Sequence, residues 1–312
     1  MSKYVKQVLC IVTGILLTPI TCASEQLSIT WLENDGKPFY IEKSQANPYG
    51  GLCNEITDML IEALPEIKHT KVMLPQKRGS KYLDEGHMAC YACMIHREEK
   101  TNRATYSIPT TVYPPFSVLS TPDTAVKITQ KHGNPVSLIS LLTDANFIYG
   151  QNDARKFGNL IDTIAINTKL YESAALSSTG SNANYALLSQ LEHGYIDYTI
   201  EYPFVADYYN QTNQKNIQKL AVNIPEKNMI FGAIGCSSSA PNNYAEKVLA
   251  KINTVLKNKI LADEKYQLSQ RIWLEQSFPE FSSHYQRYIL EPLNVIATDG
   301  SKESAQPPAK SP

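Results

Sequence analysis

The strongest constraint on the fold is an alternation of strand and helix patterns over residues 27–95. The segments "LSITWL", "KHTKVMLP" and "MACYACMI" read as strands, and the last is rich in small and apolar residues, as a buried parallel strand is. Between the first two, "GGLCNEITDMLIEALPE" places Ile56, Leu60 and Leu64 at helical spacing, with Pro65 just past its end. "GSKYLDEGH" predicts a short helix or turn. This order predicts a three-layer α/β lobe around a mostly parallel sheet.

A second α/β unit follows a break in this pattern. The prolines and polar residues of 115–127 predict a crossing, and after them "NFIYGQ" and "YIDYTIEY" read as strands, with "ANYALLSQLEHG" as a helix. "IQKLAVNIP" predicts the return crossing, before the strand "KNMIFGAIGCS" and two periodic helices. We therefore expect one lobe from 25–120 plus 222–295, a second from 121–221, and two crossings that form a hinge.

The two ends of the chain differ from this body. Residues 1–24 combine Lys3 and Lys6, a short apolar run and small residues for cleavage, which predicts a secretory signal peptide and a periplasmic protein. A membrane anchor would need about 20 apolar residues, and a lipid on Cys22 is the remaining option. Residues 296–312 are polar and rich in proline, which predicts a disordered tail.

The net charge of the chain indicates which classes of partner to expect. The chain has 29 Lys and Arg against 30 Asp and Glu, a formal net charge of −1. Nucleic-acid binding calls for a basic face, which this composition does not predict. We expect a monomer with neither nucleic acid nor cofactor.

The four cysteines beyond the predicted signal peptide are Cys53, Cys90, Cys93 and Cys236. An exported protein meets an oxidising space, and four cysteines allow three full pairings. The Cys-x-x-Cys pair at 90 and 93 lies in a strand rather than at the helix N-terminus of a redox motif. His87 and His96 are nearby, but the spacing matches no standard zinc finger, so we expect no metal site. We predict at least one disulfide that joins Cys90 or Cys93 to Cys53 or Cys236.

Several segments in this order resemble the periplasmic solute-binding proteins of the amino-acid type, family 3. They are "ITWLENDGKPFYI", "GGLCNEITDMLIEAL", "EGHMACYACMIHREEKTNRATYSIPT" and "LEHGYIDYTIEYPFV", and the likeness runs from about residue 27 to about 290. It looks closest to a poorly characterised branch with a Trp-Leu first strand. The resemblance implies the two-lobed type II periplasmic-binding fold and the capture of a small solute between the lobes.

The resemblance also implies ligand-binding positions in the first lobe. The family's carboxylate-gripping arginine falls at Lys100, counted back from Tyr106, and its Thr or Ser five residues earlier falls at Ile95. Phe39 in the Pro-Phe segment and Tyr202 are aromatics near predicted strand ends that could line the cleft; the alternative for each is core packing. The family's aromatic three residues before Phe39 is replaced by Gly36. With these changes, a differently shaped anion or a peptide-like solute fits the positions as well as a standard amino acid does. The alternative is that "HREEKTNR" is a solvated turn with internal ion pairs, since most Lys and Arg are exposed.

In the second lobe, the family's amine-binding carboxylate corresponds to Glu201, four residues after Asp197, and Tyr202 follows it. A buried carboxylate needs a partner, which a ligand ammonium would supply; the alternative is an exposed acid at a helix start ahead of Pro203. The loop "YGQNDARKFGN" offers backbone N–H groups for an anion, to which Arg155 could add its side-chain fork; the alternative is a plain connecting loop.

These patterns favour an exported binding protein, not an enzyme. It would capture a small polar solute, an amino acid or a related compound, for an ABC permease. A soluble sensor that presents its ligand to a membrane receptor is the second hypothesis. A dehydratase-like enzyme on the same fold is the third, with Glu201 and Lys100 or His96 as an acid/base pair. The sequence contains no Gly-x-Ser-x-Gly, His-Glu-x-x-His or P-loop motif.

Overall fold

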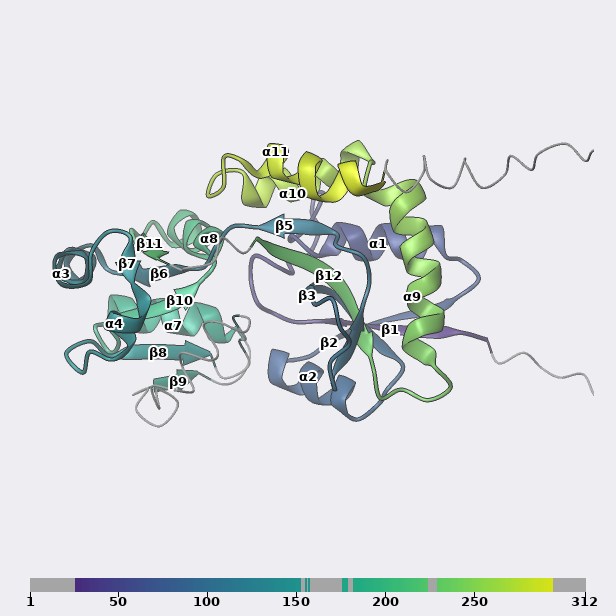
Figure 1. Ribbon diagram of the computed structural model, residues 1–312, viewed down its shortest axis with the longest axis horizontal. Coiled ribbons are helices and arrows are strands. Elements are labelled where there is room, and N and C mark those ends of the chain that lie inside the picture. The colour runs from purple at the N-terminus through teal and green to yellow at the C-terminus, as the bar shows by residue number, and fades with distance from the viewer. Residues whose placement is uncertain are drawn as a thin grey trace, which may run out of the picture.

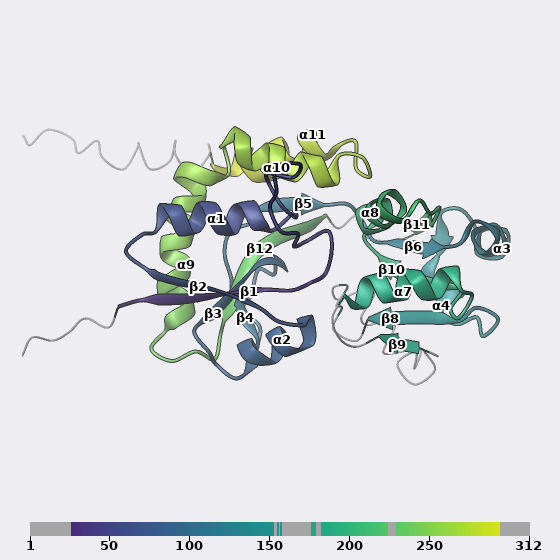
Figure 2. The same ribbon diagram turned by 180° about the vertical axis from the view of Figure 1, so that it is seen from behind.

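The computed structural model describes residues 26–152, 155, 157, 176–178, 182–223 and 229–293. They form two lobes that lie side by side, each built around one sheet (Figures 1 and 2). The two-lobed α/β architecture predicted from the alternating patterns is therefore confirmed. The expected signal peptide with Cys22, the expected tail and most of "RKFGNLIDTIA" lie outside the described residues.

The first sheet has the strand order β2-β1-β3-β12-β4, with β5 also paired to β12. Its strands are β1 (Ser28–Glu33), β2 (Lys68–Met73), β3 (Ala89–Ile95), β4 (Ala104–Tyr106), β5 (Thr111–Tyr113) and β12 (Ile230–Ser237). Strands β1, β2 and β3 are parallel, as predicted, whereas β12 is antiparallel to β3, β4 and β5. The antiparallel strand is the one with which the chain returns from the second lobe.

Strand β3 is buried on both faces, which explains its small and apolar sequence. Cys90 and Ala92 belong to the main core, whereas Ala89 and Tyr91 belong to a second cluster with Leu83. Alternate residues of a strand point to opposite faces of the sheet, so each face needs its own helical cover. Helices α1 and α2 lie on opposite sides of this sheet (Figures 1 and 2).

The helices of the first lobe come from both ends of the described chain. They are α1 (Asn54–Ala63), α2 (Gln76–Asp84), α9 (Tyr244–Val255), α10 (Glu264–Leu274) and α11 (Phe281–Tyr285), with π-helical turns at Leu256–Ile260 and Gln286–Leu290. In α1, the periodic residues Ile56, Leu60 and, just past its end, Leu64 are all buried. The predicted amphipathic face is thus the face that packs on the sheet.

The second sheet has the strand order β7-β11-β6-β10-β8-β9. Its strands are β6 (Ser117–Ser120), β7 (Val136–Ser137), β8 (Tyr149–Asn152), β9 (Leu176–Ser178), β10 (Tyr198–Glu201) and β11 (Gln218–Asn223). The helices described in this lobe are α3 (Pro122–His132), α4 (Leu138–Leu142), α7 (Ala183–Glu192) and α8 (Pro203–Asn213). Strand β6 is antiparallel to β10 and β11, and the other pairs are parallel.

The lobe boundaries differ from those expected at 120 and 221. Strand β6 already pairs with β10 from Ser117 onward, so the first crossing lies between Tyr113 and Ser117. At the return, Val222 and Asn223 still pair with β7, so β11 belongs to the second lobe rather than to a crossing. The boundaries depend on the sheet with which each strand forms its backbone hydrogen bonds. The proline and polar composition of a segment does not reveal which sheet that is.

The C-terminal helices make a further contact between the lobes. The ring of Trp273 in α10 lies 5.8 Å from the ring of Tyr208 in α8. The Ser277 hydroxyl after α10 donates a hydrogen bond to Asp207, also in α8. Figure 1 shows α10 and α11 extending over the first lobe toward α8. The lobes are therefore linked by contacts outside the two crossings.

A polar cluster on the second lobe ties α3 to α4. His132 contacts the Ser140 hydroxyl through Nδ1 at 2.9 Å and Asp144 through Nε2 at 3.0 Å. Lys131 pairs with the same Asp144 oxygen at 2.6 Å, and the backbone N–H of Asn146 donates to the other oxygen. The hydrogen bond from Lys131, followed by that from Asn146, holds the pKa of Asp144 well below its usual range.

We expect Asp144→Asn to lower stability more at neutral pH than in acid. A carboxylate whose folded-state pKa is depressed contributes stability above its unfolded-state pKa of about 3.9, and this contribution is lost as the pH falls through the folded-state value. Urea unfolding midpoints at pH 7, 4 and 2.5 should therefore converge between wild type and variant as the pH falls. A difference that stays constant over this range contradicts the assignment.

Candidate functional site

Aromatic rings from both lobes and from the first crossing meet in one buried group. The ring of Phe39, from the first lobe, lies 5.4 Å from Phe204 and 6.1 Å from Tyr202 of the second. Tyr113, the last residue of β5, lies 5.2 Å from Tyr202, and Phe116 in the crossing stacks on Tyr202 at 4.2 Å. We call this set, with two charged residues described below, the interlobe cluster: Phe39, Tyr113, Phe116, Arg155, Glu201, Tyr202 and Phe204.

The loop that carries Phe39 is fastened to the start of α1. The backbone carbonyl of Phe39 accepts a hydrogen bond from the Cys53 N–H at 2.8 Å, and that of Pro38 accepts one from Leu52 at 3.0 Å. At Gly51 a Cβ atom would come within 2.6 Å of the Phe39 carbonyl oxygen, so this close approach requires glycine. The loop is thus held by backbone contacts that only glycine permits.

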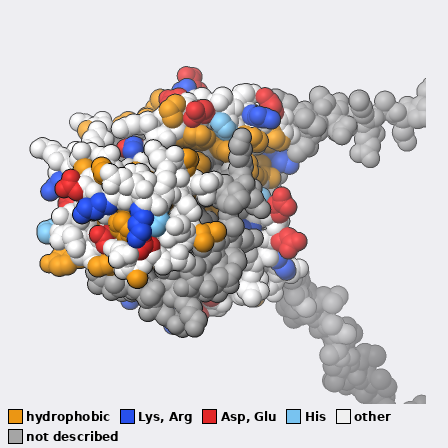
Figure 3. Space-filling model, turned by 60° about the vertical axis from the view of Figure 1, so that its left-hand side comes forward, with side chains coloured by type: hydrophobic (Ala, Val, Ile, Leu, Met, Phe, Trp, Pro, Cys, Tyr) orange, Lys and Arg blue, Asp and Glu red, His pale blue; other side chains and the backbone are white. Residues whose placement is uncertain are grey.

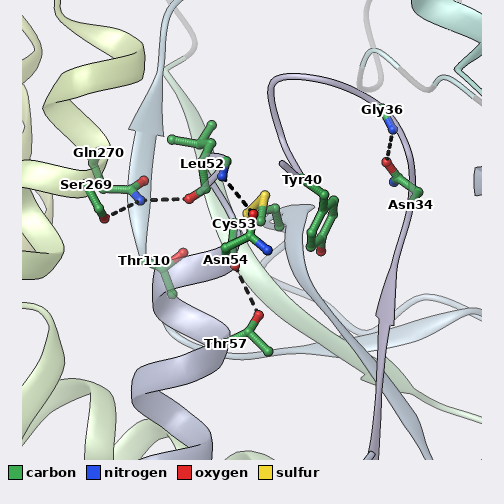
Figure 4. Close-up of a disulfide and its surroundings, with 12 residues drawn as sticks. Asn34, Gly36, Tyr40, Leu52, Cys53, Asn54, Thr57, Thr110, Ser269 and Gln270 are labelled. Carbon is green, nitrogen blue, oxygen red and sulfur yellow. Dashed lines mark hydrogen bonds between the residues drawn. A yellow bond between two sulfur atoms is a disulfide. The ribbon is translucent and has the colours of Figure 1, made fainter. Parts of the chain in front are cut away.

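Helix α10 supports the same loop from behind. The Gln270 side chain donates to the Leu52 carbonyl at 2.9 Å, as Figure 4 shows. The Trp273 indole N–H donates to the Gly50 carbonyl at 3.2 Å. In addition, the fully buried Glu55 of α1 pairs with Lys43 of the loop at 2.7 Å. Because the C-terminal helices hold the loop, Phe39 is positioned by residues more than 200 positions away in the chain.

Both cysteine pairs form disulfides, which confirms the prediction that Cys90 or Cys93 bonds to Cys53 or Cys236. Cys53 bonds to Cys93, with the Cα atoms 5.9 Å apart, next to the Phe39 loop (Figure 4). Cys90 bonds to Cys236, its register partner on the neighbouring strand β12. Cysteines held in these disulfides are structural and have no free thiolate for zinc or for redox chemistry.

The charged centre of the interlobe cluster is an ion pair between Arg155 and Glu201. Arg155 donates from Nε to Glu201 Oε2 at 2.9 Å and from Nη2 to Oε1. The backbone N–H of Tyr202 donates to the same Oε1 at 2.9 Å. The two side chains are 11% and 5% exposed, so the pair is largely removed from water. Two parallel charge-assisted bonds fix the guanidinium in one plane with the carboxylate.

The guanidinium also lies over two rings of the cluster. Its central carbon is 5.5 Å from the ring centre of Phe39 and 5.4 Å from that of Tyr202, within the range of cation–π attraction. Burial alone would lower the pKa of Arg155, but attraction to Glu201 outweighs it and raises that pKa above its ordinary value. Arg155 therefore stays charged at this site.

Two buried hydroxyls complete the cluster. Within the described part of the chain, the hydroxyl groups of Tyr113 and Tyr202 have no hydrogen-bond partner, although the residues are 2% and 1% exposed. Burial raises the pKa of both phenols above the ordinary value, so they remain protonated. A buried hydroxyl without a partner has a free-energy cost, which a solute with polar atoms at this position would remove.

The structure brings together Phe39, Arg155, Glu201 and Tyr202 from the expected site residues. Glu201 is 4% exposed, so it is not the exposed acid at a helix start that was the alternative. Its partner is Arg155 of the same chain, in the place where a ligand ammonium was expected. Phe116 and Phe204 were not singled out from the sequence; each follows a proline, in "YPPF" and "EYPF".

The other two expected residues lie elsewhere in the first lobe. Ile95 is half-buried at the end of β3, opposite Gly232 of β12. Ile95 packs against the main core, and the hydroxyl of Tyr113 lies next to Gly232. Lys100 is exposed in the turn that follows β3. Within the same turn, Arg103 pairs with Asp84 of α2 through two bonds of 2.8 and 2.9 Å. A role for Lys100 or Ile95 in binding stays a prediction.

Charges on the surface are mixed in sign. On the face seen in Figure 3, the coloured basic and acidic side chains lie interspersed rather than in one basic patch. Over the described ranges, no helix combines the length and apolar character needed to cross a membrane.

Comparison with known proteins places the fold. No protein-family model and no curated protein matches the chain. Among solved structures, the amino acid ABC transporter substrate-binding protein AbpA from Streptococcus pneumoniae, bound to L-arginine, matches with a TM-score of 0.57 and 14% identity, over 82% of this chain and 96% of that one.

Two further structures have similar scores. A histidine kinase sensor domain with similarity to periplasmic binding proteins has a TM-score of 0.57 and 14% identity, over 80% of this chain and 96% of that one. An ancestral amino acid-binding protein, a precursor of cyclohexadienyl dehydratase, has a TM-score of 0.56 and 17% identity, over 80% and 96%. The type II periplasmic-binding fold implied by the resemblance is thereby confirmed.

Proposed function

We propose that this chain, with its type II periplasmic-binding fold, captures a small polar solute between its lobes. The observation that carries the proposal is the interlobe cluster. It combines a buried ion pair with two unpartnered phenols, and its rings come from both lobes and from the crossing. Ligand sites are lined mainly by apolar and aromatic side chains with a few placed polar groups, which matches this composition.

Hinge closure is the mechanism that fits this arrangement. Phe39 is fastened to the first lobe, whereas Glu201 and Tyr202 belong to the second, so a solute among them contacts both lobes. Such a solute shifts the equilibrium between open and closed forms by its extra affinity for the closed form. The contact between Trp273 and Tyr208 adds a pivot outside the crossings.

The proposed location and partner follow from the N-terminal pattern and the fold. The basic, apolar and small-residue segments of 1–24 support export to the periplasm, where the solute would be passed to an ABC permease. One structural neighbour is an ABC transporter binding protein, and another is a sensor domain, which supports presentation to a membrane receptor as the second candidate. A monomer suffices for both roles.

An enzyme on this fold remains the third candidate, because one neighbour is a precursor of a dehydratase. The acid/base pair proposed from the sequence was Glu201 with Lys100 or His96. In the structure Glu201 is bonded to Arg155 and to the Tyr202 N–H, and Lys100 is exposed. Both carboxylate oxygens of Glu201 already accept hydrogen bonds within the chain, so the geometry favours binding over catalysis.

A thermal-shift screen tests the proposal. We expect at least one compound from a panel of amino acids, small peptides, polyamines and organic acids to raise the melting temperature, since a ligand at about 100 times its Kd adds about 2.7 kcal/mol of stability. No shift from any compound in the panel contradicts solute capture.

The same assay examines Lys100. If Lys100 grips a carboxylate, Lys100→Ala should weaken a carboxylate-bearing hit about tenfold or more, because a hydrogen bond to a charged group contributes about 1.5–3 kcal/mol. Lys127→Ala in α3 is the matched control, because Lys127 is also exposed but lies in the second lobe. Unchanged affinity in Lys100→Ala removes Lys100 from the site.

A further inference from the structure

The features of the interlobe cluster that would hold a ligand cation are already occupied by Arg155. A cation in such a site is stabilised by a carboxylate and by the faces of aromatic rings. Here the Glu201 carboxylate is bonded to Arg155 through both oxygens. The faces of Phe39 and Tyr202 lie 5.5 and 5.4 Å from the Arg155 guanidinium carbon. Arg155 thus takes the place of a cationic ligand group.

Glu201 has little capacity left for a ligand ammonium. A carboxylate offers about four acceptor positions, and three are used by Arg155 Nε, Arg155 Nη2 and the Tyr202 N–H. An ammonium brought to this point would also lie beside the buried positive charge of Arg155. Like charges in a site with little water repel strongly because screening is weak there.

Unlike an ammonium, a ligand group that accepts hydrogen bonds would find donors in the interlobe cluster. A guanidinium has five N–H donors, and Glu201 uses two of those on Arg155. Among the described residues, the buried hydroxyls of Tyr113 and Tyr202 have no hydrogen-bond partner. The unused polar capacity of the cluster is therefore mostly donor capacity, surrounded by aromatic rings.

We propose that the solute carries no ammonium group near the site, and that its carboxylate or carbonyl oxygens bond to the outer edge of Arg155 and to the hydroxyls of Tyr113 and Tyr202 while an apolar body packs among the rings. This inference rests on the proposed solute capture and specifies the ligand class for it. Arg155 acts as a built-in cation that excludes α-amino acids from the Glu201 subsite.

Matched pairs of ligands test this selectivity on the wild-type protein. The pairs are phenylalanine with 3-phenylpropionate, leucine with 4-methylpentanoate, and glutamate with glutarate; each pair differs only in the α-ammonium. Isothermal titration calorimetry at pH 7.5 should show at least one amine-free member binding about tenfold or more tighter than its amino acid. 3-Phenylpropionamide is added to distinguish a carboxylate requirement from a carbonyl requirement.

Variants at Arg155 give a second readout. Arg155→Met frees the acceptors of Glu201, so the preference within a pair should shift by about tenfold toward the amino acid. Arg155→Lys keeps the charge but loses the fork, and should keep the wild-type direction of preference with weaker binding. If Arg155→Met does not fold, the selectivity is tested by the ligand pairs on the wild-type protein and on Arg155→Lys.

The outcomes separate this inference from the proposed function. Wild-type protein that binds the amino acids as tightly as their amine-free partners, or more tightly, overturns the inference and leaves solute capture intact. Wild-type protein that binds no member of any pair also overturns it. Only the absence of any hit in the wider thermal-shift screen overturns solute capture itself.

Discussion

Replacing Cys90 and Cys236 by alanine is expected to lower the free energy of unfolding by about 5 kcal/mol. The bond joins residues separated by 146 positions, and the loop-closure entropy removed from the unfolded chain grows with the logarithm of that length. The chain segment closed by this disulfide includes the whole second lobe as described. Loss of this bond therefore adds more conformational entropy to the unfolded chain than loss of the Cys53–Cys93 bond does. Urea unfolding under oxidising conditions measures the change.

The second disulfide provides the matched comparison. Cys53 and Cys93 are separated by 40 positions, so the same relation predicts a loss of about 4 kcal/mol for their double alanine variant, which is about 1 kcal/mol less. Because this bridge ties the start of α1 to β3 next to the Phe39 loop, the variant should weaken solute binding as well. The entropic account is contradicted if removing the shorter bridge costs more stability than removing the longer one.

Glu201→Gln is expected to destabilise the protein by about 3–5 kcal/mol at neutral pH. The variant leaves the Arg155 guanidinium buried without an anionic partner, and the loss of one member of a buried pair has a cost of this size. The pair is 11% and 5% exposed, so solvent screening reduces the effect little. The free energy of unfolding at pH 7 from urea titration is the measurement.

Two controls accompany Glu201→Gln. Glu66→Gln removes an exposed carboxylate that pairs with Lys251 at 3.1 Å, and should leave stability unchanged within error. The double variant Arg155→Met with Glu201→Gln should recover much of the lost stability, because no unpaired charge stays buried. If Glu201→Gln is as stable as wild type, the buried ion pair does not exist in solution.

The sequence identified four members of the interlobe cluster for reasons that did not involve each other. Phe39 and Tyr202 were aromatics near predicted strand ends, Glu201 came from the resemblance through its spacing after Asp197, and Arg155 came from a loop expected to face an anion. Their meeting depends on two loops from opposite lobes, so no local pattern predicts it. The bond between Arg155 and Glu201 turns two expected ligand contacts into contacts with each other.

In the turn that follows β3, by contrast, a residue expected from the sequence to bind the ligand is not in the interlobe cluster. Counting from Tyr106 placed Lys100 at a ligand position, but in the structure this side chain is exposed, and Arg103 of the same turn has a bidentate partner, Asp84. Both residues are cations in one polar segment, and composition does not distinguish them. Their roles differ because α2 brings Asp84 to one position of the turn.

The sequence by itself determined the principal helices and strands, their alternation and the two-lobed class of the fold, because hydrophobic periodicity records how each element faces its own sheet. It also restricted the disulfides to a small set. Only the tertiary structure decided that Cys53 bonds to Cys93 and Cys90 to Cys236, and that Arg155 bonds to Glu201. These choices depend on distances between atoms far apart in the chain, which are set by the packing of whole elements.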